Sequence, residues 1–269
     1  MPREVCSFWI GPKPLHYLNH VCLASYVNAG HNVTLYTTTE WVDKLVVPEG
    51  VKILSADDVY DGISKKLTGR VPATAADLFR IILIKERGVI WIDTDVYCIK
   101  PFPDEQKYIF ATEAPEKLQS SNHGNINNAV LALPKDSQAL ELLSQFSFKT
   151  LGLVEEVDPR VQEYIESGVG HAILKYGPRA VTHFLGLTDE LKHQLEPSTL
   201  YPVHFNLCDC MFDPLVNLEA RFDNETLALH LWGSQIRNGW YRRRALKGSF
   251  IWKAAKKMNI NMNKYLRQK

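Results

Sequence analysis

The chain has 269 residues, of which 45% are hydrophobic and 23% charged, and this composition excludes a disordered or low-complexity polypeptide. No run approaches the roughly 18 apolar residues of a membrane-spanning helix, and no apolar signal segment opens the sequence, so we expect a cytoplasmic protein. The net charge of +1 is unevenly spread, because residues 226–269 contain eleven Lys or Arg and no Asp or Glu. This basic end predicts an anionic partner, which could be a phosphate, a lipid headgroup or nucleic acid.

Hydrophobic periodicity predicts strands and helices that alternate along the first half of the chain. A helix is expected at 14–29 and another at 74–87, where Gly88 ends the pattern. Thr74 to Asp77 resembles a capping box that opens this second helix. Strands are expected at 5–10, 32–37, 51–54, 89–92, 108–112, 128–133 and 227–232. Such alternation predicts an α/β fold with a mostly parallel central sheet and helices on both faces.

Two carboxylates, Asp93 and Asp95, directly follow the apolar strand at 89–92. Ligands of mostly parallel sheets bind beyond the carboxyl ends of the strands. If the strand continues through the pair, both side chains face one side, and their repulsion favours a cation such as Mg²⁺ or Mn²⁺. The alternative is a strand end followed by a solvated turn residue, since about 0.7 D-x-D triplets are expected by chance. A glycosidase pair is a weaker rival, because its carboxylates must flank the scissile bond from opposite sides.

Asp77 and Arg80 are three residues apart and therefore share one face of the helix at 74–87. One interpretation is a surface salt bridge, which contributes at most about 1 kcal/mol. The other is a ligand site, in which Arg80 offers a fork of donors to a phosphate or sugar hydroxyl and Asp77 accepts from hydroxyls. Taken alone, the pair favours the salt bridge.

The segment 76–102, ADLFRIILIKERGVIWIDTDVYCIKPF, resembles the sugar-binding DXD region of a glycosyltransferase superfamily. The superfamily includes the α-1,4-galactosyltransferases, the initiating α-1,6-mannosyltransferases and the glucosyltransferase domains of large cytotoxins. Its pattern is roughly (S/A)-D-L-x-R, an apolar helix, and then G-G-(I/M)-Y-x-D-x-D. Here Arg87 replaces one glycine and Trp91 stands for the aromatic residue. Weaker similarities follow in chain order at FWIG (8–11), NNAVLALP (127–134), GP (177–178) and ALHLW (228–232).

The resemblance implies a GT-A fold and a retaining glycosyltransferase that uses Mn²⁺ or Mg²⁺. Its donor would be a nucleotide-diphosphate sugar, with a UDP-sugar favoured, and its acceptor a glycan or lipid-linked glycan in polysaccharide biosynthesis. By motif match, the metal ligands would be Asp93, Asp95 and His230. The donor-binding residues would be Phe8, Trp9, Ile10, Asp77, Arg80, Asp93, Thr94 and Trp232. The catalytic residues would be Asp93, Asp95, Asn128 and Arg237.

Several of these residues also have an ordinary structural interpretation. Trp9 could be a core residue, His230 a satisfied buried histidine, and Asn128 a turn residue before a strand. Two other functions remain open: metal-dependent nucleotidyl or phosphoryl transfer, which also uses paired Asp residues, and a non-catalytic module that binds a glycan or nucleotide sugar.

The chain is expected to divide into a catalytic domain at 1–240 and a basic helical tail at 241–269. The tail could cover the diphosphate of the donor. It could also contact an anionic membrane peripherally, at the inner face, near a lipid-linked acceptor. Nucleic acid is not expected as a partner, because no nucleic-acid fold signature accompanies the charge.

Overall fold

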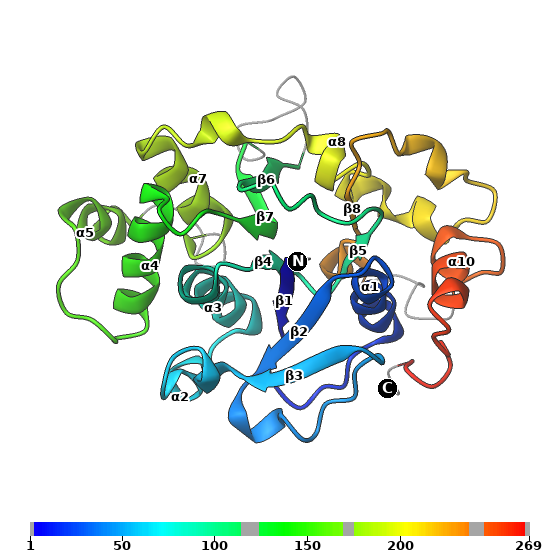
Figure 1. Ribbon diagram of the computed structural model, residues 1–269, viewed down its shortest axis with the longest axis horizontal. Helices are drawn as coiled ribbons and strands as arrows, with labels where there is room; N and C mark the ends of the chain where they lie inside the picture. Colours follow the sequence, from blue (N-terminus) through cyan, green and yellow to red (C-terminus); the bar gives the residue numbers. More distant parts are fainter. Residues whose placement is uncertain (1–2, 114–123, 169–174, 237–244, 267–269) are drawn as a thin grey trace.

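The structure is a computed structural model and describes residues 3–113, 124–168, 175–236 and 245–266. Its strands are β1 (Glu4–Phe8), β2 (Asn32–Thr37), β3 (Val51–Ser55), β4 (Ile90–Ile92), β5 (Val96–Cys98), β6 (Ile109–Thr112), β7 (Ile126–Ala132) and β8 (Ala228–His230). A six-stranded sheet has the order β3-β2-β1-β4-β7-β6 (Figure 1). β3, β2, β1 and β4 pair in parallel, whereas β7 runs antiparallel between β4 and β6. β5 and β8 form a separate antiparallel pair.

The helices lie between and around these strands, and more of them follow β7 than precede it. They are α1 (Tyr17–Asn28), α2 (Ile63–Leu67), α3 (Pro72–Arg87), α4 (Gln138–Thr150), α5 (Pro159–Glu166), α7 (Pro178–Leu187), α8 (Pro197–Leu200), α9 (Gly233–Ile236) and α10 (Phe250–Lys257). Short 3₁₀ helices lie at Thr39–Trp41, Ala56–Asp58, Leu191–His193, Phe205–Phe212 and Leu218–Arg221.

The sheet separates two hydrophobic cores, because successive strand residues point to opposite faces. Val5, Ile90 and Ile92 belong to the core that α1 and α10 cover. Cys6 and Trp91 belong to the core that α3, α4 and α7 cover. Figure 1 shows these two groups of helices on opposite sides of the central strands. The arrangement confirms the predicted fold class, an α/β fold with a mostly parallel sheet and helices on both faces.

The start of α3 and the course of the chain after β4 differ from expectation. Pro72 occupies the first turn of α3, and no side chain caps the helix, so the predicted capping box at 74–77 is wrong. Gly88 ends the helix as predicted, with φ +66°. β4 stops at Ile92, and the chain then turns, with the N–H of Val96 donating to the carbonyl of Asp93 at 3.1 Å. The strand therefore does not continue through the two carboxylates.

The segment around Tyr265 packs against α1. The backbone N–H of Tyr17 donates to the carbonyl of Tyr265 at 3.1 Å, and the rings of His20 and Tyr265 stack with centroids 3.8 Å apart.

Residues 237–244 lie outside the described residues, so the domain boundary at 240 stays a prediction. Across the described ranges, no helix combines the length and apolarity needed to span a bilayer.

Candidate active site

Residues that follow or belong to four strands lie at one edge of the main sheet. Trp9 follows β1 and Asp93 follows β4, both at carboxyl ends. β7 runs the other way, so its first residues, including Asn128, lie at the same edge. β8 joins them through the β5–β8 pair, in which His230 lies opposite Val96 and therefore beside Asp95. This edge is where an open α/β sheet is expected to bind its ligand.

Arg80 holds Asp93 in place. Its Nη2 donates to Oδ1 of Asp93 at 2.8 Å, and Nη1 donates to the backbone carbonyl of Asn128. The guanidinium lies over the ring of Trp91, 4.7 Å from the centroid, and the indole N–H of Trp91 donates to the same Asp93 oxygen at 2.8 Å. Arg80 is only 2% exposed and Asp77 only 7%, so the pair that these two residues form, at 3.4 Å, is buried. The surface salt bridge considered for Asp77 and Arg80 is therefore wrong.

Asp77 lies within α3 and points toward the start of β7. Its Oδ1 accepts from the side-chain amide of Asn128 at 2.9 Å and lies 3.4 Å from Nη2 of Arg80. Burial raises the pKa of Asp77 to about 6, although Arg80 and Asn128 both act to lower it. Gly177 lies directly against this carboxylate, since a Cβ there would meet Oδ2 at 2.6 Å. The G-P turn that precedes α7 therefore needs its glycine.

Asp95 is held by the chain that follows β8. Its Oδ2 accepts from the backbone N–H of Gly233 at 2.7 Å, and its Oδ1 lies 3.4 Å from Nε2 of His230. Burial alone would raise the pKa of Asp95, but His230 and the Gly233 N–H outweigh it and hold the pKa below its usual value. Burial lowers the pKa of His230, but the carboxylates of Asp95 and Asp93 outweigh it and raise the pKa overall.

The side chains of Asp93, Asp95 and His230 form a group that fits a divalent cation. One ligand atom from each lies within 4.8 Å of the other two. Burial and the charge of Asp95 raise the pKa of Asp93, against the effect of Arg80, so two carboxylates held this close favour a cation between them. Carboxylate oxygens suit Mg²⁺ and Mn²⁺, and an imidazole nitrogen can complete the set.

The remaining donor-binding candidates have different surroundings. Thr94 accepts from the side-chain amide of Asn19 at its carbonyl and hydroxyl oxygens, at 3.3 and 3.1 Å. Trp9 is half-buried, and its indole N–H donates to the carbonyl of Lys13 at 2.7 Å. Phe8 is buried against Phe79, with ring centroids 4.7 Å apart. Ile10 packs at the margin of the same core.

Trp232 lies beside His230, with ring centroids 4.1 Å apart. It is buried, and its indole N–H donates to the carbonyl of Val203 at 2.8 Å. Its φ is +56°, a backbone conformation that a bulky residue rarely adopts. Arg237, the remaining catalytic candidate, lies outside the described residues. The roles assigned to all of these residues stay predictions.

Sequence reasoning missed residues that support the site through close packing. Tyr201 donates its hydroxyl to the carbonyl of Asn127 at 3.0 Å and packs 6.1 Å from the rings of both His230 and Trp232. Gly233 admits Asp95 because it has no side chain. Neither has a local sequence signal, since each acts on a residue far away along the chain.

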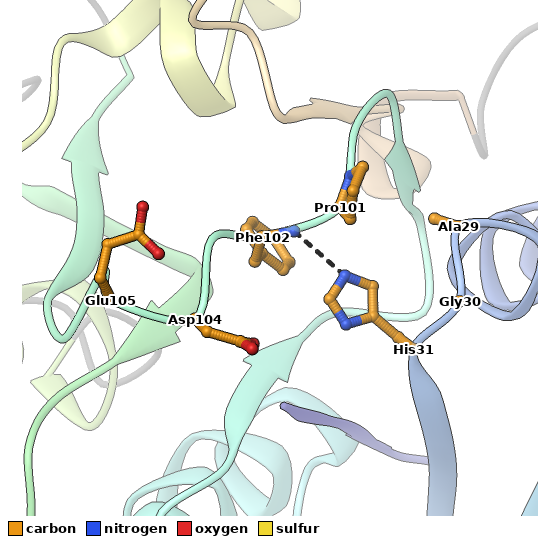
Figure 2. A pocket seen from close by; sticks show the side chains of 7 residues that line it. All are labelled: Ala29, Gly30, His31, Pro101, Phe102, Asp104 and Glu105. Atoms are coloured by element: carbon orange, nitrogen blue, oxygen red, sulfur yellow. Dashed lines mark hydrogen bonds between the residues drawn. The ribbon is translucent and has the colours of Figure 1, made fainter. Parts of the chain in front are cut away.

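A separate cavity of about 410 Å³ lies near the amino end of β2, away from this edge. Figure 2 shows His31 on its wall, with Nε2 accepting from the backbone N–H of Phe102 at 3.1 Å. His31 Nδ1 lies 3.2 Å from the carbonyl of Arg3, so the histidine ties three segments together. The lining residues are Ala29, Gly30, His31, Pro101, Phe102, Asp104 and Glu105. This cavity contains none of the predicted site residues.

Residues 57–151 match a family model described as "Capsular polysaccharide synthesis protein". The matched range contains α3, β4, Asp93 and Asp95 and the start of β7, but not His230. The match covers about a third of the chain and includes the segment 76–102, which resembles the glycosyltransferase superfamily.

Two solved structures are similar to this chain. The first is a PaToxG glycosyltransferase, 17% identical, with 71% of this chain and 70% of that chain covered and a TM-score of 0.44. The second is a ligand-free glycosyltransferase domain from the YGT toxin, 8% identical, with 76% and 83% covered and a TM-score of 0.42. A search of curated proteins gave no match. At these identities and scores, the two structures transfer no residue roles to this chain.

Proposed function

We propose that this protein is a metal-dependent, retaining glycosyltransferase. It moves a sugar from a nucleotide-diphosphate donor, for which a UDP-sugar is favoured, to a hydroxyl of a glycan or polysaccharide. The observation that carries the proposal is the joining of Asp93, Asp95 and His230 into one potential metal site, with buried Arg80 locking Asp93. The family-model match over 57–151 adds polysaccharide synthesis as the setting.

We assign a different part of the charged donor to each group of site residues. Asp93, Asp95 and His230 would hold Mn²⁺ or Mg²⁺, and such an ion neutralises negative charge that builds on a leaving diphosphate. Arg80 fixes Asp93 and screens the negative charge around it. Asp77 and Asn128, joined at 2.9 Å, present a carboxylate and an amide to sugar hydroxyls. Arg237 is proposed as a further cation near the diphosphate.

The proposal also includes the stereochemistry of transfer, which is retention at the anomeric carbon. A sugar–diphosphate bond breaks through an oxocarbenium-like state and needs no added acid, because the diphosphate is a good leaving group. Asp77 and Asp93 are both engaged by Arg80, which reduces their nucleophilicity toward the anomeric carbon. Attack by the acceptor from the face that the diphosphate leaves gives retention without a covalent intermediate.

The basic C-terminal region is proposed to rest on an anionic membrane, near a lipid-linked acceptor. Lys253, Lys256 and Lys257 of α10 are exposed and share one face of the helix, and Lys256 Nζ lies 5.4 Å from the ring of half-buried Trp252. Lysines beside an aromatic residue suit the headgroup level of a bilayer. The fraction of the protein that sediments with vesicles containing anionic phospholipid should decrease at high salt. It should also decrease in the variant in which all three lysines are replaced by Gln. Equal sedimentation with neutral vesicles would contradict this part of the proposal.

A thermal-shift screen of nucleotide sugars, with and without Mn²⁺, tests the central claim. A donor that binds the native state raises the melting temperature by mass action, and we expect the shift to need the metal. Asp95→Asn should abolish the shift, while its amide oxygen can still accept from the Gly233 N–H. Asp136→Asn is the matched control, because Asp136 is exposed and follows the far end of β7.

The products distinguish glycosyl transfer from its rivals. We expect free nucleoside diphosphate, and its release should stop under saturating EDTA and in Asp95→Asn. Release that continues undiminished in both would contradict the proposal. Pyrophosphate or a phosphorylated product would instead indicate nucleotidyl or phosphoryl transfer. Binding without release over hours, even with an acceptor present, would indicate a non-catalytic module.

A further inference from the structure

Glu113 is a carboxylate at the candidate active site that none of the motifs includes. It directly follows β6, the outermost strand of the sheet on that side. β6 is antiparallel to β7, and Thr112 pairs with Ile126 at the start of β7. Glu113 therefore lies at the same edge as Asp93, on the far side of β7.

The carboxylate of Glu113 has a fixed orientation. Its Oε1 accepts from the side-chain amide of Asn127 at 2.8 Å. Asn127 cannot turn this amide around freely, because its Oδ1 accepts from the backbone N–H of Ala129 at 2.8 Å. Glu113 is thus held by a neighbour whose own position is set within β7.

The second oxygen of Glu113 is available to a ligand. Among residues 3–113, 124–168, 175–236 and 245–266, Oε1 receives a hydrogen bond from Asn127, but Oε2 has no donor and the carboxylate no ion-pair partner. Glu113 is half-buried rather than fully solvated. A half-buried carboxylate oxygen gains free energy when it accepts from a hydroxyl group.

The order of strands along the edge indicates which part of the reaction this oxygen serves. By motif match, Trp9, which follows β1, would stack on the nucleotide base, and Asp93, which follows β4, belongs to the candidate metal site that would hold the diphosphate. β7 and β6 follow, each displaced by about 4.8 Å. Glu113 therefore lies at the end opposite the nucleotide. Its negative charge would repel a diphosphate but suits a neutral, hydroxyl-rich molecule.

We propose that Glu113 binds a hydroxyl group of the acceptor glycan and so positions the acceptor beside the donor sugar. This inference rests on the proposed glycosyltransferase function and names a residue for its acceptor side. Glu113 acts here as a hydrogen-bond acceptor and takes no proton. Its charge also contributes to raising the pKa of His230, which agrees with its placement near the metal site.

The test compares two reactions of the same enzyme: donor hydrolysis, with water as acceptor, and transfer to a sugar. Donors are UDP-glucose, UDP-galactose and UDP-N-acetylglucosamine with Mn²⁺, and acceptors are a panel of methyl glycosides. In Glu113→Gln, the side-chain oxygen can still accept from Asn127, so the fold should be kept. We expect the KM for the acceptor to rise about tenfold and the donor KM and hydrolysis rate to stay within twofold.

Glu105→Gln is the matched control, because Glu105 is exposed and lines the cavity away from the active site. It should change neither reaction. If Glu113→Gln transfers as well as the wild type, or loses hydrolysis and transfer in the same proportion, the acceptor role is wrong while the proposed function stands. If the wild type releases no nucleoside diphosphate from any donor, the proposed function fails and the acceptor role fails with it.

Discussion

The backbone N–H of Gly233 donates to Oδ2 of Asp95 at 2.7 Å, and a Cβ on Gly233 would lie at 2.7 Å from that same oxygen. No side chain fits there unless Asp95 moves. We predict that Gly233→Ala displaces Asp95 and weakens Mn²⁺ binding at least tenfold, as measured by isothermal titration calorimetry. Because the φ of Gly233 lies outside the positive region, the effect should come from contact with Asp95 rather than from backbone strain.

Gly186→Ala provides the control for this prediction. Gly186 lies within α7, and a Cβ there would make only an ordinary contact with Leu191 at 3.4 Å. Alanine is favoured over glycine in a helix, so this variant should bind Mn²⁺ like the wild type and melt no lower. Equal Mn²⁺ affinity in the two variants would show that Gly233 does not control the position of Asp95.

Much of this edge of the sheet could be predicted from sequence, because its pieces are local. Apolar runs marked the strands, Gly88 marked the end of α3, and the D-x-D pair marked a carboxyl end. The capping box failed because Pro72, which suits the first turn of a helix, starts α3 earlier. Asp77 thereby becomes an interior residue that is free to meet Asn128.

The remainder of the site depends on contacts between distant segments. The turn after β4 arises because the chain leaves the main sheet and β5 pairs with β8. This pairing brings His230 to Asp95 across a sequence separation that no periodicity encodes. His230 was indicated only by the similarity at 228–232, whereas Gly233, Tyr201 and Glu113 carry no local motif. Their importance follows from what lies next to them in space.

Arg80 is the buried cation on which two carboxylates depend. It lies 2.8 Å from Asp93 and 3.4 Å from Asp77, and it is 2% exposed. Arg80→Met keeps much of the volume over Trp91 but leaves both carboxylates without their cation. We predict a loss of about 3 kcal/mol in the free energy of unfolding, measured by urea denaturation, because a buried charge left unpaired is costly.

Arg160→Met tests whether this loss is specific to a buried ion pair. Arg160 pairs with Asp158 at 2.7 Å, but half of its side chain is exposed, at 49%. Its removal should leave the urea midpoint unchanged, since exposed pairs contribute little. If the urea midpoint fell by a similar amount in both variants, the stability lost in Arg80→Met would not depend on the burial of its ion pairs.

Asp77 makes the stability of the protein depend on pH. Its folded-state pKa is raised from 3.8 to about 6, so between these values the folded state binds a proton more tightly than the unfolded state. Stability due to Asp77 therefore decreases as pH rises from 4 to 6 and is constant above. A pKa change of this size corresponds to about 3 kcal/mol.

We expect the stability of the wild type, relative to Asp77→Asn, to fall by up to this amount between pH 4 and pH 6 in urea titrations. The asparagine can still accept from Asn128 but does not titrate. Asp61→Asn, at an exposed turn, should follow the wild type at every pH. A wild-type to Asp77→Asn difference that is independent of pH would contradict the raised pKa.

His230 should make metal affinity depend on pH in the opposite direction. The carboxylates of Asp95 and Asp93 raise its pKa above the usual 6.5 despite burial, so at lower pH the imidazolium pairs with Asp95. A metal ion needs the neutral ring, and its binding must therefore displace this proton. Below the pKa of His230, apparent Mn²⁺ affinity should rise about tenfold per pH unit, and above this pKa the affinity should become independent of pH.

Calorimetry from pH 5.5 to 8, in buffers of different ionisation enthalpy, measures both the Mn²⁺ affinity and the number of protons released on binding. His230→Gln should bind more weakly and lose this part of the pH dependence, while His193→Gln, at an exposed histidine, should match the wild type. If the Mn²⁺ affinity of the wild type depended on pH as little as that of His230→Gln, His230 would not be a metal ligand.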